Sequence, residues 1–112
     1  MGSGLGVDAD PFRSASEAPR RVRFEWDPEK SASNLAKHMV SFEEARTVFG
    51  DPLATTVVGP DHSGDEERWL TTGLSRQHRI VIVWHTDRGC TVRIIGARLA
   101  TPNERRAYES GE

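Results

Sequence analysis

The sequence predicts an α+β fold with the element order β-α-α-β-β-β-β-α, in which a curved antiparallel sheet carries helices on one face. Three observations lead to this class. Helix start signals occur at Asp27, Ser41 and Thr101, short runs with strand character fill residues 53–98, and residues 80–84 are apolar at every position. Such an apolar run is typical of a central strand that is covered on both faces.

The length and composition allow one domain. The chain has 112 residues, of which 36% are hydrophobic and 29% are charged. Residues 1–21 are rich in Gly, Pro, Ser and Ala, and we expect them to form a disordered tail. The remaining residues, 22–112, are enough for one core, so two full domains are excluded.

One strand and one helix are expected at the start of this domain. Residues 22–26 alternate between apolar and charged side chains, which is the pattern of a half-buried strand. Asp27 followed by Pro28 then predicts a helix that ends near His38. Its thin apolar stripe consists of Ala32, Leu35 and Ala36.

Two further helices begin with capping boxes. In Ser41-Phe-Glu-Glu44 the hydroxyl can accept from the backbone of Glu44, while the Glu44 carboxylate returns to the Ser41 amide. Thr101-Pro-Asn-Glu104 repeats this pattern. The predicted helices cover residues 42–49, ended by 50–52, and 102–109. Four strands are expected between them, at residues 53–58, 68–74, 79–85 and 91–98.

The charge is divided unevenly along the chain. Residues 1–67 carry 7 Lys or Arg against 13 Asp or Glu, whereas residues 68–112 carry 8 Arg and no Lys against 4 acids. Arginine is favoured where a phosphate or carboxylate is bound by two parallel hydrogen bonds, because its guanidinium group is planar and donates both. The second half therefore indicates a polyanion or an acidic protein as partner, with a merely solvated surface as the alternative.

The sequence also excludes several classes of protein. It has no apolar stretch long enough to span a bilayer and no signal peptide, so we expect a cytoplasmic protein without a membrane partner. Cys90 is the single cysteine, which excludes an intrachain disulfide and a cysteine zinc site. The acidic segment 61–67 is a weak metal signal because it lacks the spacing of a calcium loop. We expect no metal and no cofactor.

Several blocks of residues point to one family in an uninterrupted order. These blocks are Phe24-Glu-Trp-Asp-Pro28, Val40-Ser-Phe-Glu-Glu-Ala45, Phe49-Gly-Asp-Pro52, Glu67-Arg68, Arg93-Ile-Ile95, Ala97-Arg98 and Glu104-Arg105. They make the chain resemble the BrnT toxins of bacterial type II toxin-antitoxin systems. Two positions depart from the pattern: Met39 stands where the family usually has glycine, and Gly96 stands where serine is common.

The resemblance implies a RelE-like ribonuclease fold and RNA cleavage that inhibits translation. It also implies neutralisation by a BrnA-like antitoxin of the ribbon-helix-helix type, in a heterotetramer of two toxins and two antitoxins. Operator DNA would then be contacted only through the antitoxin.

RNA cleavage without a metal requires attack of a ribose 2′-oxygen on the neighbouring phosphate, with proton transfers and stabilisation of the added charge. Arginine suits the charge stabilisation, and histidine suits the proton transfers. The candidate catalytic residues are Arg68, His85, Arg98 and Arg105. The candidate RNA-binding residues are Arg79, Arg93, Arg106 and Tyr108.

The arrangement of these arginines is open at the level of sequence. Simple alternation places Arg98 on the same side of its strand as Ile94 and Val92, with Arg93 facing the other way. Arg68 could also pair with a neighbouring glutamate, and Arg98 with Glu104. A non-catalytic module, in which the arginines dock an acidic protein or a nucleic acid, explains the charge distribution equally well.

Overall fold

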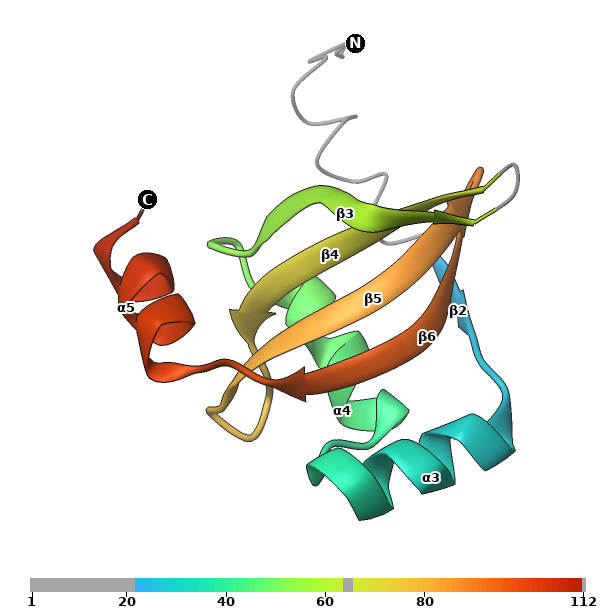
Figure 1. The fold of residues 1–112 in the computed structure, drawn as a ribbon, viewed down its shortest axis with the longest axis horizontal. Coiled ribbons are helices and arrows are strands. Elements are labelled where there is room, and N and C mark those ends of the chain that lie inside the picture. Colours follow the sequence, from blue (N-terminus) through green and yellow to red (C-terminus); the bar gives the residue numbers. More distant parts are fainter. Residues whose placement is uncertain (1–21, 64–65, 112) are drawn as a thin grey trace, which may run out of the picture.

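The computed structural model describes residues 22–63 and 66–111, and the predicted tail of residues 1–21 lies outside them. The described elements follow the predicted order, with one added 3-10 turn (Figure 1). They are β2 (Arg23–Glu25), α3 (Pro28–His38), α4 (Phe42–Thr47), η2 (Val48–Gly50), β3 (Thr55–Ser63), β4 (Glu66–Leu74), β5 (Ile80–Arg88), β6 (Thr91–Leu99) and α5 (Pro102–Ser110).

The described strands form one five-stranded sheet in the order β2-β6-β5-β4-β3. The four long strands pair antiparallel, and β5 lies at the centre, as the apolar run predicts. The short β2 pairs parallel with β6, so the sheet is mixed. The helices and three other strands lie between β2 and β6 in the sequence. Because this connection is long, β2 can pair parallel with β6, which a tight hairpin would not allow.

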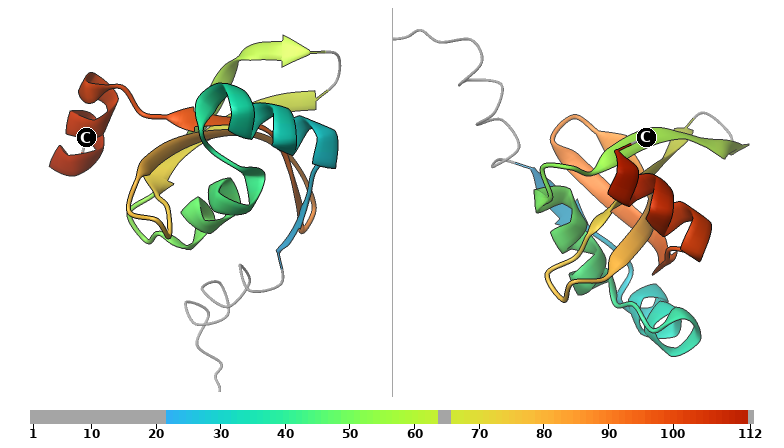
Figure 2. Two further views of the ribbon diagram at one scale, coloured as in Figure 1. Left: turned by 90° about the horizontal axis from the view of Figure 1, so that it is seen from below. Right: turned by 90° about the vertical axis from the view of Figure 1, so that its left-hand side faces the viewer.

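The sheet curves around α4, which packs on one of its faces (Figure 2). We call this the covered face. Its core joins apolar side chains of α4 and η2 to the odd-numbered positions of β5 and to β6. The buried set includes Phe42, Ala45, Val48, Val81, Val83, Val92, Ile94 and Ala97. These side chains confirm the predicted apolar face of the second helix.

The opposite side of the sheet, which we call the open face, has α5 only at one end (Figure 1). Alternation along the strands and the pairing register assign its side chains. The open face comprises Arg68, Leu70 and Thr72 of β4, Ile82, Trp84, Thr86 and Arg88 of β5, and Thr91, Arg93 and Arg98 of β6. Glu25 of β2 joins it beside Arg93.

A β-bulge in β6 corrects the expected orientation of two arginines. Arg93 lies opposite Thr86 and Arg98 lies opposite Ile82, with a register shift between Trp84 and His85. Because one extra residue is inserted in β6, the alternation resets, and both arginines belong to the open face. The burial pattern agrees, since Ile94 and Ala97 are both buried although they differ by three positions.

The helix starts follow the predicted capping chemistry with one exception. Asp27 caps α3, and Thr101 forms a full capping box with Glu104. Ser41 accepts from the Glu44 backbone, but the Glu44 carboxylate does not return to the Ser41 amide as expected. It instead binds Ser75 and Arg79 from the turn before β5, because these donors offer a charged partner inside the protein.

Candidate functional site

The open face gathers arginines from three strands of the sheet. Arg68 comes from β4, Arg88 from β5, and Arg93 and Arg98 from β6. Arg93 and Arg98 lie opposite positions 86 and 82 of β5, so they are about 13 Å apart along the sheet at ~3.3 Å per residue. Trp84 projects from β5 between these two levels. The arrangement suits an extended polyanion better than a single phosphate.

The Arg98 guanidinium forms a bidentate ion pair with the Glu104 carboxylate. Its Nη1 and Nη2 donate to the two carboxylate oxygens of Glu104 at 2.8 and 2.9 Å. The guanidinium carbon also lies 5.4 Å from the centre of the Trp84 ring. The hydrogen bond from Arg98 is the main reason why the pKa of Glu104 falls to about 2, and the same bond raises the pKa of Arg98. A phosphate can occupy the position of this carboxylate, because both present paired oxygens to the guanidinium.

Arg68 and Arg105 differ from Arg98 in having a guanidinium without a hydrogen bond or ion pair to any residue that the structure describes. Arg68 is half-buried on β4, and Arg105 is exposed on the first turns of α5. The alternative pairing of Arg68 with Glu67 is not formed. The other alternative partner of Arg68, Glu66, has a side chain outside the part of the structure that is described, while the exposed Arg105 guanidinium is accessible to an incoming anion.

Arg93 lines a pocket at the end of the open face that is remote from α5. The pocket has a volume of about 480 Å³ and is lined by Glu25, Thr86, Arg88, Thr91 and Arg93. Arg93 Nη1 donates to the Glu25 carboxylate at 3.3 Å, and both side chains are about half exposed. Exposed pairs of this kind are worth at most ~1 kcal/mol, so an anion can compete for Arg93 at little cost.

His85 lies on the covered face, with only 1% of its surface exposed. Its Nε2 is 2.8 Å from the Thr71 hydroxyl and its Nδ1 is 2.6 Å from the Asp87 carboxylate, while Thr71 contacts Thr56 at 2.7 Å. Phe49 packs edge-on against the imidazole. Both ring nitrogens are occupied, and the structure does not bring His85 together with the arginines of the open face.

The other predicted RNA-binding residues have structural partners. Arg79 binds the buried Glu44 carboxylate and the carbonyl oxygen of Met39, away from the open face. Arg106 donates to Asn103 within α5. The Tyr108 hydroxyl donates to Asp51, and this bond raises the pKa of Tyr108 to about 12. Tyr108 thus fastens α5 to the segment before β3.

Three residues of the open face are not among the candidate site residues identified from the sequence: Trp84, Thr86 and Arg88. The apolar run in β5 assigns Trp84 to the core, although the even positions of the strand face away from α4. Arg88 ends β5 in the hairpin to β6, directly opposite Thr91. The period-two count along β5 is the signal that could have placed all three on one face.

The described ranges contain neither a metal-binding cluster nor a membrane-spanning helix. There, no group of three or more His, Cys, Asp or Glu side chains is placed to hold a metal ion. The acidic segment of residues 61–67 falls largely outside the part whose side chains are described. None of the described helices has the length and apolar character needed to cross a bilayer.

These features define a small α+β protein in which α4 and η2 cover one face of a mixed five-stranded sheet and arginines lie on the other. Similarity to known proteins narrows this class. The model of the family described as "Ribonuclease toxin, BrnT, of type II toxin-antitoxin system" matches residues 26–104. The chain belongs to this BrnT family of ribonuclease toxins.

A solved structure supports the same fold. The BrnT ribonuclease toxin of Brucella abortus superposes with a TM-score of 0.53 at 22% sequence identity, over 71% of this chain and 97% of the Brucella chain. No curated protein sequence matches the chain. The predicted fold class and family are thus confirmed.

Proposed function

We propose that this protein is a cytoplasmic, metal-independent endoribonuclease that cleaves RNA and thereby inhibits translation. A BrnA-like ribbon-helix-helix antitoxin holds it inactive in a complex of two toxins and two antitoxins, and operator DNA is bound through the antitoxin alone. Membership in a family of ribonuclease toxins supports the general activity. Residues 22–112 form the single toxin domain.

The observation that carries this proposal is the alignment of arginines on the open face by the β6 bulge. Arg68, Arg93 and Arg98 then flank Trp84 on a surface where only α5 packs at one end. An RNA strand laid across these residues would bind its phosphates to guanidinium groups and stack a base on the indole ring. Arg105, Arg106 and Tyr108 of α5 would extend this surface.

Cleavage at this surface relies mainly on electrostatic stabilisation. Attack of the 2′-oxygen on the phosphorus adds negative charge to the non-bridging oxygens, and we assign the stabilisation of this charge to Arg98 and Arg68. Arg98 exchanges the Glu104 carboxylate for the phosphate as RNA binds. The cleaved strand then carries a 2′,3′-cyclic phosphate, and the 5′-oxygen of the leaving nucleotide takes up a proton.

The proton transfers are assigned to solvent water. The pKa of Glu104 is about 2 while Arg98 binds it, and a Glu104 released by Arg98 is no stronger a base than an ordinary carboxylate, while Tyr108, with a pKa of about 12, is a weak acid at neutral pH. His85 does not touch the RNA in this scheme. It acts as a positioning residue, because its contacts to Thr71 and Asp87 tie β4 to β5 beside the β6 bulge.

The test is cleavage of RNA by the purified protein in the presence of EDTA, with analysis of the new ends. We expect cyclic phosphate ends from the wild-type protein and a loss of at least ~100-fold in the Arg68→Ala, Arg98→Ala double variant, since each lost charge-stabilising group costs ~10–100-fold or more. Arg76→Ala is the matched control, because Arg76 lies exposed in the turn before β5. Circular dichroism must show that all variants are folded.

Full activity in the folded double variant would contradict the site. A wild-type protein that binds RNA without cutting it, and whose expression does not arrest growth, would indicate the non-catalytic binding module instead.

A further inference from the structure

Helix α3 packs against the protein through its polar side. Ser31 is 8% exposed, and its hydroxyl accepts a hydrogen bond from the Phe42 amide. The Asn34 amide nitrogen donates to the carbonyl oxygens of Val40 and Ala97, both at 2.8 Å, and the Ala97 amide donates to Asn34 Oδ1 at 3.3 Å. Asn34 therefore occupies the edge of β6 beyond the point where β2 ends.

This anchoring leaves the apolar stripe of α3 in solvent. Leu35 is 49% exposed and Met39, the residue that ends the helix, is 64% exposed. The stripe follows the i, i+3, i+4, i+7 spacing of one helix side and consists of Ala32, Leu35, Ala36 and Met39, all exposed. A helix of a monomeric protein normally buries such a stripe, and an exposed one marks a surface for another molecule.

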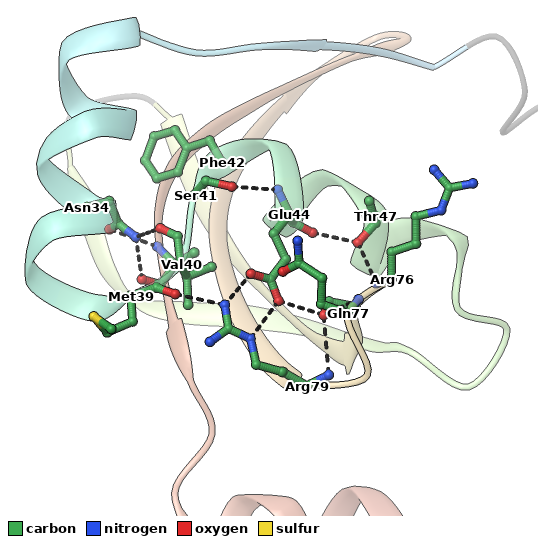
Figure 3. Close-up of polar contacts among 12 residues, drawn as sticks. Asn34, Met39, Val40, Ser41, Phe42, Glu44, Thr47, Arg76, Gln77 and Arg79 are labelled. Atoms are coloured by element: carbon green, nitrogen blue, oxygen red, sulfur yellow. Dashed lines mark hydrogen bonds and ion pairs between the residues drawn. The ribbon is translucent and has the colours of Figure 1, made fainter.

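The backbone of Met39 is in a conformation that strains any residue other than glycine. Its φ of 65° and ψ of 23° lie in the left-handed region, which glycine usually occupies at the end of a helix. A side chain other than glycine there costs about 1–2 kcal/mol. The Arg79 guanidinium holds this conformation by donating to the Met39 carbonyl oxygen at 2.7 Å (Figure 3).

Figure 3 shows the hydrogen bonds that hold the backbone at Met39. Arg79 is fixed in turn by the buried Glu44 carboxylate, while the Met39 side chain points away from this pair. A position where strain is maintained around an exposed apolar side chain is typical of a functional surface. The second half of α3 thus presents Leu35 and Met39 on a rigid support.

The charges around these two residues are basic. Lys37 and His38 occupy the last turn of α3, and Arg79 contacts the backbone of Met39. Among the residues that the structure describes, the carboxylate bound to Arg79 is that of Glu44, which is buried. A partner that covers Leu35 and Met39 therefore gains from carboxylates beside its apolar side chains.

We propose that the outer side of α3, formed by Ala32, Leu35, Ala36 and Met39, is the docking site for the cognate protein antitoxin. The antitoxin contributes a segment with apolar side chains flanked by carboxylates. This inference rests on the proposed function for the existence of that antitoxin. The arginines of the open face belong to β4, β5 and β6, so antitoxin docking on α3 is separable by mutation from RNA cleavage.

Met39→Gly is the sharpest test, because it removes the side chain and also relieves the backbone strain. We expect the variant to have a higher midpoint of thermal unfolding and unchanged RNA cleavage, while the dissociation constant for the purified cognate antitoxin rises about tenfold or more, as it does for a central interface residue. Leu35→Ala should weaken antitoxin binding similarly. Leu53→Ala, which truncates a leucine that is 69% exposed outside α3, is the matched control.

Binding is measured by isothermal titration calorimetry, and cleavage by the free toxin is measured separately. The inference is overturned if Met39→Gly and Leu35→Ala bind the antitoxin as tightly as the wild type. It is equally overturned if these variants alter only self-association of the toxin, which would assign the stripe to a second copy of this chain. An inactive wild-type toxin would defeat the proposed function but would leave the binding result interpretable.

Discussion

The buried carboxylate of Glu44 offers a quantitative test of how this small domain is held together. Its side chain is 2% exposed and joins α4 to the turn before β5. Glu44 Oε2 accepts from the Ser75 hydroxyl at 2.7 Å and from Arg79 Nε at 2.9 Å, and Oε1 accepts a second bond from Arg79. We predict that Glu44→Gln destabilises the protein strongly, while Glu43→Gln, on the exposed side of the same helix, does not.

The magnitude follows from the burial of the two partners. Removing one member of a buried ion pair costs about 3–5 kcal/mol, because the other charge loses its partner. The Arg79 side chain is 34% exposed, so water partly replaces the carboxylate, and we expect a loss of about 2–3 kcal/mol. With a urea dependence of ~1 kcal/mol per molar for a small domain, the unfolding midpoint should fall by about 2–3 M.

The stabilisation by Glu44 should also depend on pH. Burial raises the pKa of Glu44, but the hydrogen bonds from Arg79 and Ser75 outweigh it, and the pKa in the folded protein lies below the ordinary value of 4.5. A lowered folded pKa means that the stabilisation is complete above pH 4.5 and is lost as the pH falls through the folded pKa. The Glu44→Gln variant should lack this part of the acid dependence.

Urea unfolding followed by tryptophan fluorescence measures both effects. Glu43→Gln should stay within ~0.5 kcal/mol of the wild type, as exposed substitutions do. Equal midpoints for the Glu44 and Glu43 variants would refute the reasoning, because they would show that the pair contributes no more than a solvated carboxylate.

Two other predictions concern α5 and the packing of η2 on the sheet. Tyr108 is the only tyrosine of the chain, so its absorbance titration should give a midpoint near pH 12, and Asp51→Asn should return it toward 10. Because the folded pKa is raised, the contribution of Tyr108 to stability is complete below pH 10 and is lost as the pH rises through 12. Gly73→Ala should cost about 1–3 kcal/mol in urea unfolding. Its new Cβ would lie 2.9 Å from the Ala54 Cβ, whereas Gly96→Ala meets nothing closer than 3.9 Å and should be tolerated.

The local signals in the sequence predict most of the fold. The caps at Asp27 and Thr101, the central position of β5 and the order of the elements are all confirmed. These features depend on residues close together in sequence, such as a hydroxyl and an amide three positions apart. The family resemblance adds the fold class and the ribonuclease family, which the family match confirms.

Contacts between distant residues are the part that the sequence does not predict. Glu44 completes an ion pair with Arg79 rather than a capping box, because folding brings a stronger donor to it. Asn34 binds the edge of β6 and so turns the apolar stripe of α3 outward. Alternation along β5 puts His85 on the covered face with Val81 and Val83, but its contacts with Thr71 and Phe49 come from distant parts of the chain. The assigned roles of the site residues stay predictions.

The extra residue in β6, Ile95, brings Arg93 and Arg98 to the same face although they are five positions apart. Deleting Ile95 would remove the bulge and leave Arg93 and Arg98 four positions apart, so that regular alternation alone would keep both side chains on the open face. If β6 instead kept all its residues and paired without a bulge, one of the two arginines would turn toward the covered face, and the open face would lose a cation although the net charge of the chain is unchanged. In related toxins, the number of residues between these two arginines therefore decides whether a bulge is needed to bring both to one face.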